Sequence, residues 1–384
     1  MDNVDRPRSP FGAPPQGGRA RTERAPARSR VAGERLAACK PQGAAGGPAK
    51  PVPRRLLDAG APRSAIRWLA FVFFGAALVF AGVAALLGDV FFFRLATEAL
   101  IFGGLALSVD ILLGRTGLLP LGQALFFGFG AYVSALVLKE VTPSFWLALA
   151  VVLVSATLVG LAAGMIAIRA KGVYFALISF GLAQVVSKVV FNTRELGASD
   201  GIIGVPVPQI SLLFFTVDAA HAPSFFLLVL GAVGALYAVL AWLMDTPFGR
   251  QLAAIKANES RVPFLGFDPW RYKLAAYVLA ANVAALSGAF YPMLRGFVSP
   301  ELMFFQVSGS AIINVIVGGT GTLVGPLYGA AILTVLKSVV GSFTAHHQIV
   351  IGVLFVVSVI YFPKGLVGYL APALERRWKR KQTP

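Results

Sequence analysis

Residues 68–88 read Trp68-Leu-Ala-Phe-Val-Phe-Phe-Gly-Ala-Ala-Leu-Val-Phe-Ala-Gly-Val-Ala-Ala-Leu-Leu-Gly88, and none of these 21 residues carries a charge. A helix rises about 1.5 Å per residue and the hydrocarbon core of a bilayer is about 30 Å thick, so roughly 20 apolar residues cross it. Similar blocks recur along the chain. Hydrophobic residues make up 57% of it and charged residues only 13%, about half the usual share in soluble proteins. The sequence predicts an all-α polytopic membrane bundle.

The apolar blocks predict about ten membrane spans. Glu98 and Asp110 fall in the second block, near its ends, where acidic side chains are expected to reach toward the membrane interface. The ten blocks lie near residues 68–88, 95–113, 118–138, 145–168, 173–191, 224–244, 272–292, 302–317, 323–340 and 347–362.

The basic residues indicate the orientation of these spans. Cytoplasmic loops of membrane proteins are enriched in Lys and Arg. If the N-terminus is inside, the inner loops and the cluster at 376–381 hold most of the Lys and Arg, and each outer loop with a basic residue holds just one. The sequence therefore predicts that both termini are cytoplasmic. The outer basic residues are Arg94, Lys139, Arg194 and Arg295.

The chain is expected to have a basic tail at each end of a membrane domain at 68–370. Residues 1–67 hold 14 Lys and Arg against 5 Asp and Glu, are rich in Pro, Gly and Ala, and show no apolar period. Such a segment cannot bury enough surface to offset its ordering entropy, so we expect a disordered cytoplasmic tail that touches anionic lipid. The alternative is that the true start of the protein lies further along the chain than Met1. Interleaved aromatic residues are lacking, so nucleic acid is not an expected partner. Residues 371–384 are the second basic tail.

A polar segment interrupts the apolar blocks at 249–266. Good helix formers at 251–258 predict a short helix on which Leu252 and Ile255 share a face. We expect this apolar face to enter a groove on a partner protein, while charged residues set the register at the rim. A helix lying on the inner leaflet is the alternative. The rim residues are Arg250, Lys256, Glu259 and Arg261.

Three glycines, Gly321, Gly325 and Gly329, recur at four-residue spacing. On one continuous helix they share a face and let a neighbouring backbone approach closely. A broken helix is the alternative, because Gly318-Gly-Thr-Gly321 and Pro326 weaken helix formation. Gly114-Arg-Thr-Gly117 has the same Gly-x-Thr-Gly form, which raises the possibility of a pseudo-repeat.

Neutral polar residues inside the spans are candidates for a solute pathway. Their donors and acceptors suit a polar or zwitterionic solute, although hydrogen bonds between helices explain them equally well. The spans hold few acids, which counts against a proton-driven carrier. The long outer loop at 192–223 is expected to dock an external partner. The candidate pathway residues are Gln123, Gln184, Asn282 and Asn314.

The sequence predicts no catalytic residue and no metal site. No lysine follows a glycine, which excludes the phosphate-binding loop Gly-x-x-x-x-Gly-Lys-Ser/Thr. The single cysteine, Cys39, can form neither an internal disulfide nor a cysteine metal site.

Several ordered motifs of the chain form one recognisable set. The first is Gly117-Leu-Leu-Pro-Leu-Gly-Gln-Ala-Leu-Phe-Phe-Gly-Phe-Gly-Ala-Tyr132. The other motifs are Arg169–Ala176, Ser199–Gly204, Gly249–Gly266 with Arg271-Tyr-Lys, Phe297–Glu301, Gly318–Pro326 and Pro363–Leu366. Together they resemble branched-chain amino-acid ABC transporter permeases of the LivM type, apart from Pro120, where that family usually has Ser. The likeness covers residues 95–370.

The resemblance implies the membrane-spanning subunit of an ATP-driven importer in a bacterial cytoplasmic (inner) membrane. Such a subunit works with a homologous second permease, two cytoplasmic ATPase subunits and a periplasmic solute-binding protein. It also implies that this chain binds no cofactor and that the partner ATPases use ATP. Urea-type permeases share many of the motifs, so a urea or short-amide importer is an alternative. A self-sufficient secondary carrier is an alternative from another class.

Overall fold

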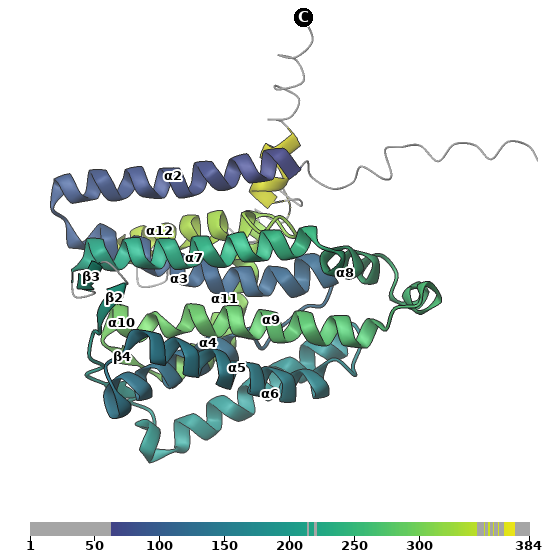
Figure 1. Cartoon of the computed structure of the whole chain (residues 1–384), viewed down its shortest axis with the longest axis horizontal. Helices are drawn as coiled ribbons and strands as arrows, with labels where there is room; N and C mark the ends of the chain where they lie inside the picture. Colours follow the sequence, from purple (N-terminus) through teal and green to yellow (C-terminus); the bar gives the residue numbers. More distant parts are fainter. Residues whose placement is uncertain are drawn as a thin grey trace, which may run out of the picture. The chain divides into compact units, whose positions relative to one another are not determined.

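The computed structural model describes residues 63–212, 215–218, 221–343 and 365–372, with a few single positions between 349 and 360. Residues 1–62 of the predicted N-terminal tail, most of the predicted tenth span at 347–362 and residues 373–384 lie outside the described residues. The described part is helical almost throughout (Figure 1).

The long helices are joined by short helical turns and four short strands. Strand β1 (Ile202–Ile203) pairs antiparallel with β4 (Phe297–Val298), and β2 (Gln209–Leu212) pairs antiparallel with β3 (Phe215–Asp218). The α-helices are α2 (Arg63–Leu87), α3 (Val90–Asp110), α4 (Gln123–Leu136), α5 (Phe145–Ala167), α6 (Val173–Asn192), α7 (Ala222–Asp245), α8 (Pro247–Ala257), α9 (Pro269–Ala289), α10 (Tyr291–Arg295), α11 (Phe305–Gly318) and α12 (Gly325–Phe343). The π-helical turns are η2 (Ile111–Thr116) and η3 (Val137–Val141), and the 3₁₀ turns are η4 (Arg194–Leu196), η5 (Glu259–Leu265) and η6 (Pro300–Met303).

Within the described residues, eight helices are long and apolar enough to cross a membrane. They correspond to predicted spans one to seven and nine, and so confirm the polytopic bundle. The first begins five residues earlier than predicted, because α2 starts at Arg63. The predicted eighth span is α11, a helix of 14 residues that is too short to cross the hydrocarbon core alone.

Helices α3, α4 and α9 form the centre of the bundle. Helix α9 packs against α3, α4 and α5, and its contacting face is rich in alanine and glycine, which lets the backbones approach closely. The peripheral helices α2 and α5 instead expose large apolar side chains such as Phe71 and Leu158. An apolar outer face of this kind suits contact with lipid.

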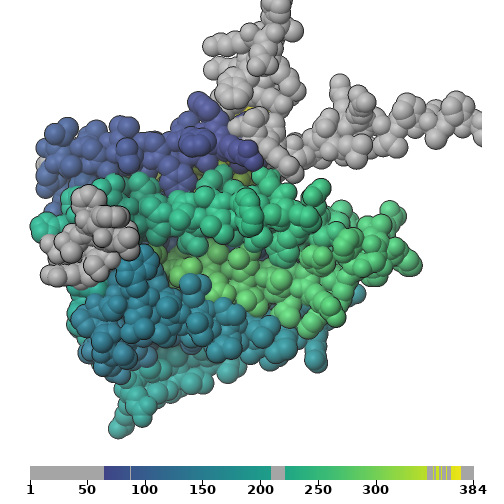
Figure 2. Space-filling model, viewed as in Figure 1, coloured from purple at the N-terminus to yellow at the C-terminus, as the bar shows by residue number. Residues whose placement is uncertain are grey.

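The predicted inner loops lie together at one end of the bundle, which we call the α8 end. Helix α8 lies there, and the η5 turn beyond it protrudes (Figures 1 and 2). Among the described residues, the ion pairs at this end include Arg67–Asp245, Lys171–Glu259, Lys273–Glu259 and Arg271–Asp268.

The predicted outer loops meet at the opposite end, which we call the β4 end. Arg295 pairs with Glu98 at 2.6 Å, and the Lys139 ammonium donates to the Ile203 carbonyl at 3.1 Å. Successive loops therefore lie at alternate ends of the bundle, in the order that the distribution of basic residues predicted. Which end faces the cytoplasm stays a prediction from the charges.

Helices α11 and α12 are separated by a loop, so the prediction of one continuous glycine face was wrong. Gly321 has φ +78°, a left-handed conformation outside any helix, while Gly325 begins α12. The alternative of a broken helix is the one that the structure shows. Gly325 and Gly329 do meet backbone closely, because a β-carbon on Gly329 would collide with the Asn314 carbonyl oxygen.

Candidate functional site

The polar segment at the α8 end folds as one helix followed by a 3₁₀ turn. Helix α8 starts at Pro247, a residue suited to the first helical position because its missing N–H would have no partner there. Turn η5 contains Pro263 and ends at Gly266, whose φ of +82° lets the chain reverse into α9. The predicted short helix is therefore confirmed, with four more residues at its start.

The apolar face of α8 is directed into this chain and not toward a partner. Leu252 is 0% exposed and Ile255 is 3% exposed, because α8 packs against η2, α7 and α9. The expectation that these two side chains enter a groove on another protein was wrong. An amphipathic pattern shows that one face is buried, and here the bundle itself buries it.

Two of the four expected rim residues also bond within the chain. The Lys256 ammonium donates to the Gly114 carbonyl at 2.6 Å, and Glu259 accepts from Lys273 at 2.9 Å. Both side chains therefore have partners within the chain, although Lys256 is also exposed and Glu259 is half-buried. Arg250 and Arg261 are exposed, as a rim requires.

The exposed tip of the segment is Phe264-Leu265 in η5. Phe264 is 90% exposed and Leu265 is 66% exposed, beside the exposed Arg261. This pair is not among the residues that the sequence predicted to face a partner. The available signal was an apolar dipeptide directly after Pro263, a residue that discourages continuation of the helix.

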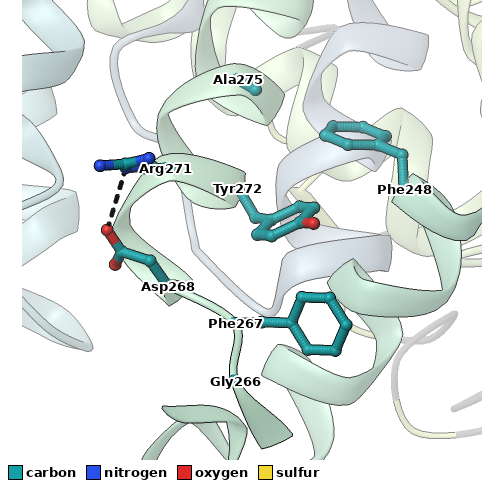
Figure 3. Close-up of a pocket in the computed structure, with 7 residues that line it drawn as sticks. All are labelled: Phe248, Gly266, Phe267, Asp268, Arg271, Tyr272 and Ala275. Carbon is teal, nitrogen blue, oxygen red and sulfur yellow. Dashed lines mark ion pairs between the residues drawn. The ribbon is translucent and has the colours of Figure 1, made fainter.

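A shallow pocket lies beside this tip, where η5 leads into α9 (Figure 3). The ring of Tyr272 lies between those of Phe248 and Phe267, with both pairs of centroids 6.1 Å apart. At the rim Asp268 pairs with Arg271 at 3.4 Å and also accepts from the Trp270 N–H, which caps α9. The three packed rings join α8, α9 and the link between η5 and α9 at the base of the tip.

A buried loop lies near the same end, between α11 and α12. The carboxyl group of Asp110 is fully buried and accepts the N–H groups of Gly321 at 2.5 Å and Leu323 at 3.0 Å. Thr322 donates to the Gly319 carbonyl and accepts from the Gly325 N–H. The expectation that Asp110 reaches the interface was wrong, because its side chain satisfies backbone groups inside the bundle.

No hydrogen bond in the described part of the chain joins the four candidate pathway residues to one another. Asn282 donates to the Val278 carbonyl and accepts from Thr157, so it joins α9 to α5. Gln184 is half-buried on α6, and Asn314 is buried on α11. Gln123 is 1% exposed, and neither polar atom of its side chain has a hydrogen-bond partner. Among the described residues, no group of three His, Cys, Asp or Glu could hold a metal ion.

Comparison with known proteins then decides the family. The family described as the permease component of branched-chain amino acid transport systems matches residues 91–359, more than half of the chain. The chain belongs to this family. The permease is therefore the membrane-spanning subunit of an ATP-driven importer, and separate subunits hydrolyse ATP.

The relatives of this permease include both subunit types of one transport system. It is 29% identical over 301 residues to the high-affinity branched-chain amino acid transport system permease protein LivM of Escherichia coli, covering 73% of this chain and 71% of that protein. It is 22% identical over 279 residues to LivH of Salmonella typhimurium, covering 69% and 90%. It is also 26% identical over 170 residues to the ribose import permease protein RbsC of Bacillus subtilis, covering 41% and 45%. No solved structure matches the permease.

Proposed function

We propose that this permease imports branched-chain or related amino acids across a bacterial inner membrane, and that cytoplasmic ATPases dock on its α8–η5 segment. The observation that carries the docking proposal is the exposed Phe264-Leu265 tip on a segment that the bundle holds rigidly. The α8 end also carries the excess of basic loops, which supports a cytoplasmic location for this end.

The chemistry of the tip indicates how an ATPase would bind it. A phenylalanine that protrudes into water loses little entropy on binding and can bury a large apolar area. Arg261 lies in the same turn as the tip, and Arg250 and Arg271 are exposed on the helices before and after it, so the groove that receives the tip should have acidic residues at its edge. The aromatic pocket beside the tip can accept an apolar side chain in return.

The remaining partners follow from the family. The likeness to LivH supports a homologous second permease, and a periplasmic solute-binding protein would dock at the β4 end, on the loop that carries η4 and β1. ATP would be bound by two ATPase subunits and not by this chain. Lipid would cover the exposed faces of α2 and α5.

The solute is the least constrained part of the proposal. The LivM likeness supports a branched-chain amino acid, whereas the shorter likeness to RbsC shows that related permeases serve unlike solutes. The alternative of urea or a short amide predicts uptake of a neutral solute that lacks the α-amino acid group. A secondary carrier predicts uptake without any ATPase.

Uptake by the reconstituted transporter separates these functions. Proteoliposomes should hold this permease, its second permease, both ATPases and internal ATP, with the binding protein outside. We expect uptake of labelled leucine, isoleucine or valine and none of urea. Urea uptake would contradict the solute, and equal uptake without the ATPases would contradict the class of transporter.

Docking is tested with two equally exposed phenylalanines. Phe264 is 90% exposed at the α8 end, and Phe343 is 85% exposed at the end of α12. We expect Phe264→Ser to weaken binding of the ATPases to the purified permeases by about tenfold or more, a loss typical of a central interface residue. Phe343→Ser should leave binding unchanged. Normal binding by Phe264→Ser would contradict the docking surface.

A further inference from the structure

The loop between α11 and α12 depends on a residue that is distant in sequence. In the loop at 319–324 only Thr320 is exposed and Gly321 is half-buried, so most of the backbone groups of the loop cannot rely on water. Two of its N–H groups, from Gly321 and Leu323, are accepted by the two carboxyl oxygens of Asp110 on α3. The position of the loop is therefore fixed by the end of α3.

The same end of α3 is held from the other side by α8. Turn η2 continues α3 directly, and its Gly114 lies four residues after Asp110. The Gly114 carbonyl accepts from Lys256 Nζ at 2.6 Å, and the carbon stem of Lys256 packs against Gly117. Gly114 also touches the loop itself, since a β-carbon there would lie 2.7 Å from the Cα of Gly321. Residues 110–117 thus lie between α8 and the loop, in contact with both.

Few parts of this arrangement can move independently. Leu252 and Ile255 fix the buried face of α8 on η2, α7 and α9, so α8 and η2 shift together. Turn η2, which lies between α8 and the loop, is π-helical, a local irregularity that is frequent at functional sites. A displacement of α8 is therefore delivered to Gly114 and Asp110, and from them to Gly321 and Leu323.

We propose that Lys256 and Asp110 are positioning residues that link the α8–η5 segment to the α11–α12 break, so that ATPase docking and the position of α11, which carries the candidate pathway residue Asn314, depend on each other. The link rests on the proposed function, because it assumes that the ATPases dock at η5. Movement of the loop changes how α11 and α12 meet. By thermodynamic reciprocity, a change at the break alters the affinity with which the ATPase docks.

The chemistry of each residue selects the test variants. Asp110→Asn keeps the size but leaves one acceptor oxygen for two N–H groups and turns an NH₂ group toward the other. Lys256→Met keeps the stem and removes the donor, while Lys256→Arg restores a donor. Lys171→Met is the matched control, because Lys171 is an exposed lysine at the same end with its ammonium 4.0 Å from Glu259.

The experiment measures stimulation in the complete transporter. Each variant is assembled with the second permease, the ATPases and the solute-loaded binding protein, and its ATP hydrolysis is compared with the basal rate. We expect Lys256→Met and Asp110→Asn to assemble and keep basal hydrolysis but lose stimulation by about fivefold or more, the lower range of allosteric coupling. Lys256→Arg should recover most of it, and Lys171→Met should match the wild type.

A double variant distinguishes a link from two separate defects. If both residues act along one route, Lys256→Met with Asp110→Asn loses no more stimulation than the worse single variant. A loss equal to the product of the two single losses overturns the proposal. Normal stimulation in an assembled Lys256→Met complex overturns it too, and this variant decides the matter even if Asp110→Asn does not fold.

Movement of the loop is observed separately at its exposed residue. With Cys39→Ser as background, Thr320→Cys is labelled by a thiol reagent with and without ATP. We expect ATP to change the labelling rate in the wild-type sequence and not with Lys256→Met. An unchanged rate in the wild-type sequence overturns the link. If the ATPases do not bind the wild-type permease at all, the proposed function has failed instead.

Discussion

Lys273 at the start of α9 pairs with Glu259 at the start of η5, with 2.9 Å between Nζ and Oε1 and the lysine side chain only 4% exposed. Glu259 is a third exposed, so water reaches the pair from one side. The pair ties the protruding turn to the central helix of the bundle.

Removing the negative charge should leave the buried lysine without its partner. We expect Glu259→Gln to lower the stability of the permease by about 1–3 kcal/mol, between the values for exposed and buried pairs. Thermal unfolding in detergent measures this. Glu259→Gln with Lys273→Met should recover part of the loss, and an unchanged midpoint for Glu259→Gln alone would show that the pair anchors nothing.

Two leucines of the α8–η5 segment should behave in opposite ways. Leu252→Ala creates a cavity in the core and should cost about 2–5 kcal/mol of stability, seen as a lower unfolding midpoint. Leu265→Ala removes an exposed side chain, so the midpoint should hold while ATPase binding weakens. Equal unfolding midpoints for both variants would mean that Leu252 is not part of the core.

The effect of replacing a glycine of α12 by alanine should depend on the atoms that the new methyl group contacts. At Gly329 a β-carbon runs into the Asn314 carbonyl, and at Gly325 it lies 2.5 Å from the Gly319 carbonyl oxygen, so even alanine should impair folding at either position. At Gly341 nothing lies within 4 Å, and alanine should be neutral or slightly stabilising. The yield of monodisperse permease after size exclusion checks this, and good yield of Gly329→Ala would contradict the close approach.

The two ends of the bundle should differ in their access to a reagent that cannot cross membranes. Ser199 and Ser260 are both exposed, the first at the β4 end and the second at the α8 end. In a Cys39→Ser background, Ser199→Cys should be labelled from outside intact cells and Ser260→Cys only after the cells are opened. The reverse pattern would invert the topology.

Residues 2–60 should be dispensable for transport, because they precede the first span and have no apolar period. We expect their deletion to leave ATP-driven uptake nearly intact, with the amount of inserted protein as the control. Loss of uptake by a normally inserted deletion would assign the tail a specific role.

Eight of the ten predicted spans are confirmed, because length and apolar composition alone select a membrane helix. The buried contacts could not be predicted. Asp110 lies 211 residues before the Gly321 N–H that it accepts, and no local pattern reveals such a partner. The periodicity of Leu252 and Ile255 correctly indicated a buried face, but periodicity does not show what buries it. The spacing of Gly321 and Gly325 is the same whether the helix continues or breaks, so only the left-handed backbone at Gly321 decides between the two.

The pairing of Ile202 with Val298 couples the loop that carries β1 closely to α11. From Val298 only six residues intervene before α11 begins at Phe305, and four of them are coiled in η6. Since an extended residue spans at most about 3.6 Å, so short and partly wound a connection cannot absorb a large displacement. A displacement of the predicted outer loop at β1 should therefore displace the first turn of α11 as well. The surface at the β4 end and the broken helix are thus expected to move together.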